Sequence, residues 1–146
     1  MNFDDLKLDN QLCHKFYVLS NRITRRYRPL LKEIGLTYPQ YLILMALWEK
    51  DQLNACDVVC KTKIDPGSLT LILDKLKKKD LINLESCSED KRKKIITLTE
   101  KGEELKERAI EIPRKLSCEL GDFSQEDFQK LSELIDKFSC SLPQEK

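Results

Sequence analysis

The sequence predicts a mainly helical protein with one small β-hairpin. Apolar residues recur every three or four positions through most of its 146 residues, which is typical of amphipathic helices. Two short apolar runs, 81–84 and 94–98, flank a polar segment and predict two strands joined by a turn. Apolar residues make up 40% of the chain, enough for one core, so we expect a single domain over 1–146.

Composition argues against several classes of protein. Two of the first five residues are acidic and no run of about 18 apolar residues occurs, so we expect a cytoplasmic protein without signal peptide or membrane span. Four glycines and one histidine, His14, leave little material for a phosphate-binding loop, a His-containing zinc site or a His-based triad. We therefore expect no cofactor, no metal and no enzymatic activity, and six reduced cysteines rather than a disulfide scaffold.

A long first helix is predicted from about residue 10 to 32. Six basic and no acidic residues lie in this segment, so its polar face is positively charged. A second helix over 39–49 is strongly apolar, with Thr37 as its cap and Pro39 in its first turn, and we expect it in the core. The apolar face of the first helix consists of Leu12, Phe16, Leu19, Ile23, Tyr27 and Leu30.

Two short helices in succession come next. Asn54 and Asp65 are typical helix caps, and the second of these helices is expected over 66–79. Two adjacent short helices suggest a helix-turn-helix, and the hairpin after them makes it a winged one. In that architecture the second helix enters the major groove of DNA and the hairpin reaches a minor groove. We therefore expect 38–99 to bind double-stranded DNA.

Two further helices follow the hairpin. A helix over about 100–118, bent at Pro113, precedes a last helix that begins at Ser124. These helices have no partner in a small winged core, so we expect segments 8–33 and 100–142 to form the interface of a homodimer. A two-fold dimer would hold two recognition helices about 34 Å apart and bind a palindromic operator.

The predicted recognition helix and the hairpin tip are rich in groups that bind DNA. Ser68 and Thr70 offer short hydrogen-bonding side chains near the start of that helix, and Arg92 suits a narrow minor groove. The competing interpretation of the charges is a solvated surface. The lysines expected to meet phosphates are Lys75, Lys77, Lys78, Lys79, Lys91, Lys93 and Lys94.

Cys13 stands out among the six cysteines. His14 is beside it, Tyr17 lies one turn further along the helix, and the surroundings are basic, which would stabilise a reactive thiolate. The alternative from spacing alone is a buried and inert thiol. Cys56 and Cys60 lie four residues apart on a short helix, and we expect them to pack in the core rather than to bind metal.

Several segments carry a resemblance to a known family. Segments 9–13 and 36–42 resemble motifs of the organic-hydroperoxide sensors called OhrR, a branch of the MarR family of winged-helix transcription regulators. Segment 65–70 is similar to the start of that family's recognition helix. The resemblance covers nearly the whole chain. The residues that match the family's DNA-binding wing are Asp90, Lys91, Arg92 and segment 98–102.

The resemblance implies a homodimeric DNA-binding repressor that senses organic hydroperoxides. The cysteine that matches Cys13 is the peroxidatic residue of that branch, and Tyr17, Tyr27 and Tyr38 match the tyrosines that support its thiolate. Cys118 has a position similar to the resolving cysteine of the two-cysteine members. The reduced protein would then bind its operator, and oxidation of Cys13 followed by a bridge to Cys118 of the partner subunit would release it. As an alternative, a low-molecular-weight thiol could cap Cys13.

Several positions depart from the family pattern, among them segment 61–63, which is more polar than the usual end of the third helix. His14 stands where Phe is usual, Pro66 and Leu71 replace a usual Ser and Pro, and Asp74 stands where a basic residue is common. These departures affect the surroundings of the thiol and the choice of operator. Three rival functions remain open: a MarR-type regulator released by a small phenolic ligand, a thiol peroxidase that uses Cys13, and a dimeric adaptor without DNA binding.

Overall fold

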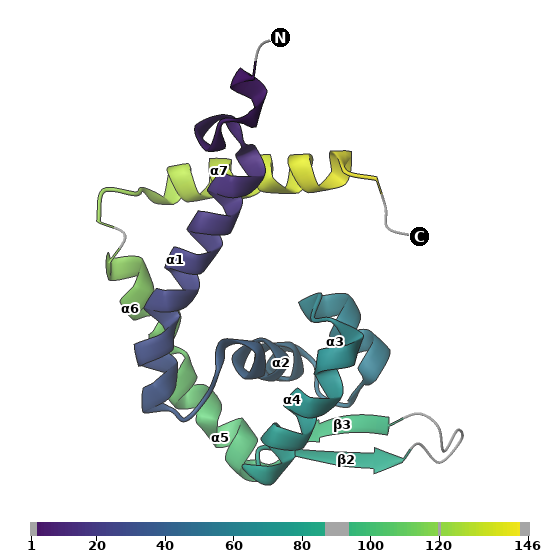
Figure 1. Cartoon of the computed structure of the whole chain (residues 1–146). Helices are drawn as coiled ribbons and strands as arrows, with labels where there is room; N and C mark the ends of the chain where they lie inside the picture. Colours follow the sequence, from purple (N-terminus) through teal and green to yellow (C-terminus); the bar gives the residue numbers. More distant parts are fainter. Residues whose placement is uncertain (1–2, 87–93, 120, 144–146) are drawn as a thin grey trace. The chain divides into compact units, whose positions relative to one another are not determined.

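The computed structural model describes residues 3–86, 94–119 and 121–143. Its two compact units are Met1–Ile112 and Pro113–Lys146. Helices α1 to α5 and the three strands lie in the first unit, and helix α7 lies in the second (Figure 1). Within the described ranges, no helix combines the length and apolar character that crossing a membrane requires.

Helix α1 (Leu12–Glu33) is the long first helix that the sequence predicts, and two 3-10 turns at Asp4–Leu6 and Leu8–Asn10 precede it. Its apolar side chains are only partly covered within the first unit. Leu31 is 1% exposed, whereas Leu12 is 48% exposed. Exposed apolar side chains along one helix are typical of a surface that packs against another molecule.

Helix α2 (Tyr38–Glu49) lies in the core, as predicted. Thr37 and Gln40 form the capping box at its start, with the backbone N–H of Thr37 donating to Gln40 Oε1 at 3.1 Å. Met45, which we expected in the core, is 38% exposed. The buried residues of the helix are Gln40, Tyr41, Ile43, Leu44, Ala46 and Leu47.

Helices α3 (Ala55–Thr62) and α4 (Pro66–Lys78) form the predicted helix-turn-helix. Asn54 and Asp65 cap them, and each side chain accepts a 3.0 Å hydrogen bond from the backbone N–H three residues on. These caps satisfy donors that have no acceptor inside the helix, which fixes where each helix begins. The buried side of α4 consists of Leu69, Leu73 and Leu76.

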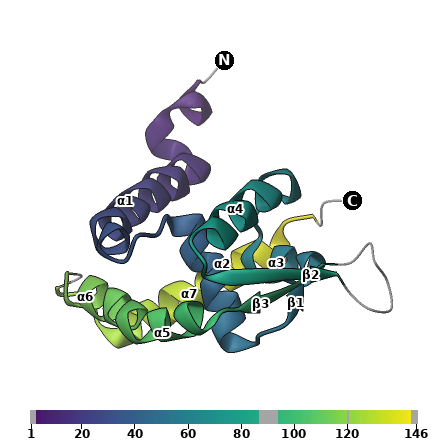
Figure 2. The same cartoon turned by 90° about the horizontal axis from the view of Figure 1, so that it is seen from below.

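Strands β2 (Ile82–Ser86) and β3 (Lys94–Leu98) pair antiparallel over their whole length, as the predicted hairpin requires. A third strand, β1 (Leu53–Asn54), pairs with the other edge of β3. We did not predict β1, because two residues are too few to show a periodic pattern. The sheet lies beside α4 (Figure 2), and Ile96 at its centre is fully buried.

Helix α5 (Glu100–Ala109) approaches the hairpin most closely at Gly102. A Cβ atom at this position would lie 2.1 Å from the backbone oxygen of Leu81, so the contact requires glycine. Trp48 Nε1 donates a 3.0 Å hydrogen bond to the carbonyl oxygen of Gly102. These contacts attach α5 to the winged part of the first unit.

The single bent helix predicted over 100–118 is in fact two helices, α5 and α6 (Glu111–Glu119). The break lies at Ile110 rather than at Pro113. Proline has no N–H, so the carbonyl oxygen of Ala109, four residues earlier, has no donor within the helix. The interruption therefore falls almost one turn before the proline itself.

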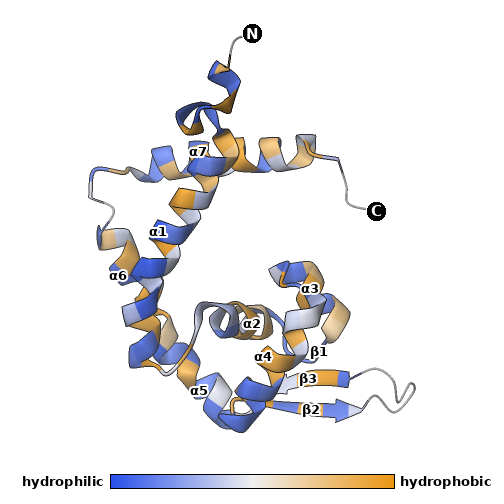
Figure 3. Ribbon diagram, in the orientation of Figure 1, coloured by the Kyte–Doolittle hydropathy of each residue, from blue (hydrophilic) through white to orange (hydrophobic). Residues whose placement is uncertain are grey.

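Helix α7 (Gln125–Ser141) begins after Ser124, as predicted. The Ser124 Oγ accepts a 3.1 Å hydrogen bond from the backbone N–H of Asp127. Hydrogen bonds from the Ser124 side chain and backbone lower the pKa of Asp127. Every described residue of 121–143 is exposed, although an apolar stripe follows the helix (Figure 3). Such a stripe is typical of a helix that packs against another surface.

Candidate redox and DNA-binding site

Cys13 is the second residue of α1, and its thiol is exposed. Backbone N–H groups at a helix N-terminus lack intrahelical acceptors and carry partial positive charge, which stabilises an anion such as a thiolate. His14 is half-buried, and Tyr17, one turn further on, is 68% exposed. The exposed position removes the alternative of a buried Cys13 and leaves the thiol accessible to a reactant.

Tyr27 and Tyr38 lie together, with ring centroids 5.1 Å apart and planes tilted by 52°. Tyr41 extends the cluster into the core, 6.1 Å from Tyr27 and 6.2 Å from Trp48. Burial raises the pKa of Tyr27, and the nearby Tyr38 raises it further. The Tyr27 phenol therefore stays protonated at neutral pH and can donate a hydrogen bond.

The tyrosine pair is far from Cys13 of the same chain. Tyr27 follows Cys13 by fourteen residues on one helix, and a rise of 1.5 Å per residue separates them by about 21 Å. A hydrogen bond spans only about 3 Å. Within one chain the predicted site is thus divided between Cys13 with Tyr17 at one end of α1 and Tyr27 with Tyr38 near the other.

Cys118 lies on α6 and is exposed, as is Cys140 on α7. Cys118 belongs to the second unit and Cys13 to the first, and their pairing stays a prediction. Cys87 lies outside the described residues.

Cys56 and Cys60 contradict our expectation that they pack in the core. Both thiols are exposed, whereas Val58 between them is fully buried. A helix has 3.6 residues per turn, so positions 56 and 60 share one side of α3 and position 58 lies on the other. The described residues contain no group of three or more His, Cys, Asp or Glu side chains that could hold a metal ion.

The outer surface of α4 carries the predicted DNA contacts of this helix. Ser68, Thr70 and Lys75 are all exposed. Leu71 is 59% exposed and Asp74 is also exposed, so both departures from the family pattern lie at the surface rather than in the core. This surface presents hydroxyl, ammonium, carboxylate and apolar groups, the types that contact base edges and phosphates.

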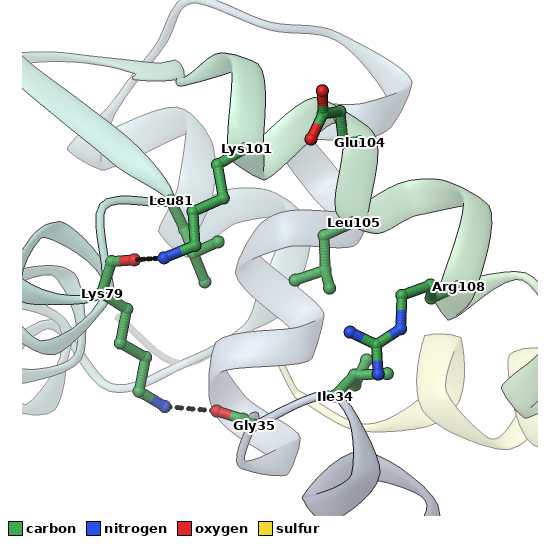
Figure 4. A pocket seen from close by; sticks show the side chains of 8 residues that line it. All are labelled: Ile34, Gly35, Lys79, Leu81, Lys101, Glu104, Leu105 and Arg108. Carbon is green, nitrogen blue, oxygen red and sulfur yellow. Dashed lines mark hydrogen bonds between the residues drawn. The ribbon is translucent and has the colours of Figure 1, made fainter.

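Lys79, which we expected to meet DNA phosphates, instead forms part of the fold. Its Nζ donates to the carbonyl oxygen of Gly35 at 2.5 Å (Figure 4) and to Gln40 Oε1 at 2.8 Å. Burial lowers the pKa of Lys79, and the nearby Lys75 lowers it further. Because Lys79 is the C-cap residue of α4, its ammonium connects the recognition helix with the turn between α1 and α2. No sequence pattern indicated this contact, which joins residues 44 positions apart.

Two further positively charged side chains, Lys101 and Arg108, connect the same part of the fold with α5. Lys101 Nζ donates to the carbonyl oxygen of Lys79 at 2.8 Å, and Arg108 Nη2 donates to that of Glu33 at 2.9 Å. Both side chains line a cavity of about 410 Å³ together with Ile34 (Figure 4). Hydrogen bonds from charged donors thereby connect the ends of α1 and α4 with α5.

A second cavity, of about 590 Å³, lies beside Tyr38. Arg28, Lys32 and Lys79 bring positive charge to its wall, and Thr24 and Tyr38 bring hydroxyl groups. A cavity of this size with a few polar groups suits a small organic molecule, and the charge favours an anion.

The predicted wing contacts Asp90, Lys91 and Arg92 lie outside the described residues. Lys94, the first residue of β3, is exposed. Strands β2 and β3 flank the segment as the sequence predicts, and its contacts with DNA stay predictions.

A helix-turn-helix followed by a small antiparallel sheet, with hydroxyl and ammonium groups on its second helix, defines the class of winged-helix DNA-binding regulators. The family model for transcriptional regulator SarA/Rot matches residues 25–109, more than half of the chain. The chain belongs to this family of transcriptional regulators.

Two relatives of known name cover nearly the whole chain. The organic hydroperoxide resistance transcriptional regulator of Bacillus subtilis (strain 168) is 39% identical over 133 residues, which are 91% of this chain and 90% of that protein. The HTH-type transcriptional regulator SarZ of Staphylococcus epidermidis is 35% identical over 138 residues, 94% of this chain and 93% of SarZ. The resemblance to MarR-type regulators of the hydroperoxide-sensor branch is therefore confirmed.

AbfR is a similar protein with several solved structures. Overoxidised AbfR bound to DNA matches with a TM-score of 0.75 and 30% identity over 94% of this chain and 99% of AbfR. Reduced AbfR bound to DNA matches with a TM-score of 0.73 and 30% identity over 92% of this chain and 98% of AbfR. The disulfide form of AbfR matches with a TM-score of 0.64 and 28% identity over 94% of this chain and 91% of AbfR. These matches confirm the winged-helix fold.

Proposed function

We propose that this protein is a homodimeric repressor that binds a palindromic operator while Cys13 is reduced and leaves it when an organic hydroperoxide oxidises Cys13. The observation that carries this proposal is the exposed thiol at the N-terminus of α1, in a chain 39% identical to an organic hydroperoxide resistance regulator. The thiolate attacks one peroxide oxygen, the O–O bond breaks, and the products are a sulfenic acid at Cys13 and an alcohol.

A second copy of the chain completes the redox site. Tyr27 lies about 21 Å along α1 from Cys13 of its own chain, and Tyr38, at the start of α2, packs against Tyr27. In this proposal both tyrosines therefore serve the thiolate of the partner subunit. The exposed apolar sides of α1 and α7 supply an interface for such a dimer. The raised pKa of Tyr27 keeps its hydroxyl protonated, which is the state that donates to a thiolate.

The sulfenic acid then condenses with a second thiol. Cys118 of the partner subunit attacks the sulfur of Cys13, water leaves, and a disulfide forms. AbfR supports this step, since it has been solved overoxidised on DNA and, separately, in a disulfide form. In this proposal disulfide formation, rather than oxidation alone, is the releasing event. Capping of Cys13 by a low-molecular-weight thiol is the alternative.

Lys79 provides a route from the redox site to the recognition helix. Tyr38 begins α2, Gln40 lies in the same turn, and the Lys79 ammonium holds Gln40 and Gly35 to the end of α4. A rearrangement of the turn between α1 and α2 would move α4 with it. The two recognition helices of the dimer would then lose the spacing of the two half-sites.

Operator release tests the proposal. The reduced protein, with cumene hydroperoxide as the oxidant, should bind a promoter fragment from its own locus and leave it on oxidation. Cys13→Ser should stay bound. Wild type should show a dimer band on a non-reducing gel, and Cys118→Ser should lack it. Release of Cys13→Ser by the oxidant would contradict the proposal, and release of Cys118→Ser without a dimer band would favour capping.

Charge removal tests the DNA-binding surface. Arg92→Ala should weaken operator binding about tenfold, since a good base-edge or minor-groove contact contributes about 1–3 kcal/mol. Lys75→Ala should weaken binding to all sequences and reduce the salt dependence by about one counterion. Lys137→Ala, on α7, is the matched control and should bind like wild type. Wild-type affinity in Arg92→Ala would show that the wing assignment is wrong.

A second candidate function is release by a small phenolic acid. The positively charged cavity of about 590 Å³ beside Tyr38 favours this function. Its cationic side chains can bind a carboxylate, and its apolar side chains can contact an aromatic ring. In that case the Cys13→Ser protein would still leave DNA when the ligand is added, and Arg28→Ala would not.

A further inference from the structure

Helix α3 carries two exposed free thiols that the proposed function does not use. Cys56 and Cys60 lie on the same side of the helix, opposite the fully buried Val58. Cysteine is among the most frequently buried residue types, so two exposed thiols on one side of an eight-residue helix are unusual. Packing in the core therefore accounts for neither thiol.

The helix holds the two thiols at a defined spacing. Asn54 caps one end through a 3.0 Å bond from the backbone N–H of Asp57, and Lys63 ends the helix in the left-handed conformation, with φ of 56°. Thr62 Oγ1 also donates to the carbonyl oxygen of Val58 at 2.7 Å. These contacts keep α3 helical, so the Cβ atoms of residues four apart lie about 5–6 Å from each other.

This spacing favours a bridging atom over a disulfide. An unstrained disulfide needs Cβ atoms about 3.5–4.5 Å apart, which an intact helix does not provide at this separation. A metal or metalloid bound to two sulfurs at about 2.3 Å each adds the missing length. Among the described residues no group of three or more His, Cys, Asp or Glu side chains could hold a metal ion, so the bound atom must be one that two sulfurs satisfy.

We propose that Cys56 and Cys60 form a two-thiol binding site for a soft, thiophilic ion or metalloid, of which trivalent arsenic is the model. With phenylarsine oxide, both S–H protons and the arsenic-bound oxygen leave as water, and two As–S bonds form. No atom is oxidised or reduced in this step. The site lies in the helix-turn-helix, on a different helix from the peroxide-reactive Cys13.

Phenylarsine oxide binding tests this site in the full chain. Intact-mass measurement should find one arsenical on each chain, with neither thiol left to react with Ellman's reagent and the adduct stable to excess 2-mercaptoethanol. The test protein keeps only the Cys56 and Cys60 thiols and carries four replacements: Cys13→Ser, Cys87→Ser, Cys118→Ser and Cys140→Ser.

Removal of either thiol from this test protein is the decisive comparison. Cys56→Ser or Cys60→Ser should weaken retention about 100-fold, because the second sulfur then no longer binds at a high effective concentration. Circular dichroism before each measurement shows that the variants remain folded. The proposal would be overturned if either single variant kept the arsenical in the presence of 2-mercaptoethanol. It would also be overturned if the two-thiol protein bound no arsenical.

Discussion

The protonation state of the Tyr27 hydroxyl decides whether it can donate a hydrogen bond in the proposed redox site. Its hydroxyl lies in a half-buried cluster with Tyr38, and burial keeps it protonated. A protonated phenol can donate to a thiolate, whereas a phenolate would repel it. In the proposed mechanism Tyr27 should therefore affect the rate of Cys13 oxidation and not the DNA-binding surface.

Tyr27→Phe should slow the oxidation of Cys13 by cumene hydroperoxide about tenfold while leaving operator affinity of the reduced protein unchanged. A hydrogen bond to a charged group contributes about 1.5–3 kcal/mol, and about 1.4 kcal/mol corresponds to a factor of ten. Stopped-flow measurement of sulfenic acid formation checks the rate. Tyr41→Phe, in the same cluster but deeper in the core, is the control and should react like wild type.

The same tyrosines make the fold sensitive to high pH. The pKa of Tyr27 is raised above its ordinary value of about 10, so the buried phenol contributes its full stability below about pH 10. That contribution is lost as the pH rises through the folded-state pKa. Tyr41 is raised for the same reason, first by burial and then by its tyrosine neighbours. The free energy of unfolding should therefore fall above about pH 10, and less steeply in Tyr27→Phe, in urea titrations.

At the scale of the elements, Lys79 connects the end of α4 with the turn between α1 and α2 through two hydrogen bonds. Lys79→Met should lower the free energy of unfolding by about 1 kcal/mol, since two hydrogen bonds from a partly exposed ammonium are lost. It should also reduce the ratio of operator affinities between the reduced and the oxidised protein, because α4 no longer follows the turn at Gly35. Urea unfolding and operator titrations in both redox states measure the two effects.

Lys78→Met is the matched control for this prediction. Lys78 is exposed beside Lys79 at the end of α4, so its removal should change affinity equally in both redox states. Equal affinity ratios in Lys78→Met and Lys79→Met would show that Lys79 does not connect the redox site with the recognition helix.

Caps and periodicity were enough to predict most elements. Asn54, Asp65 and Ser124 each begin a helix because a short polar side chain satisfies a free backbone N–H, and this is a local property of the sequence. The predicted bend at Pro113 was wrong: the break lies at Ile110, because proline acts on the carbonyl oxygen four residues before it.

The candidate site was predictable only where its signals are local. The surroundings of Cys13 can be read from its neighbours in sequence, and its exposure agrees with a reactive thiol. Lys79 and Cys56 could not be placed in this way. Lys79 is defined by contacts with distant residues, and the exposure of Cys56 depends on which side of α3 meets the core.

At the scale of the whole molecule, the exposed apolar faces predict assembly. Leu131 lies at the centre of the apolar stripe of α7, together with Phe128 and Ile135. Leu131→Glu should convert a dimer into a monomer, because it places a charge in a desolvated interface. Light scattering after size-exclusion chromatography gives the mass. Gln129→Glu, on the polar side of the helix, should remain a dimer, and a monomeric wild type would contradict the prediction.

The most direct test of the account follows the preformed operator complex as it is oxidised. Fluorescence anisotropy of a labelled operator, titrated with cumene hydroperoxide, should fall to the unbound value near one peroxide per reactive Cys13, and a dithiol reductant should restore it. Cys13→Ser should keep the bound value throughout. An unchanged anisotropy in wild type while mass spectrometry shows Cys13 oxidised and bridged would contradict the central claim that this thiol controls DNA binding.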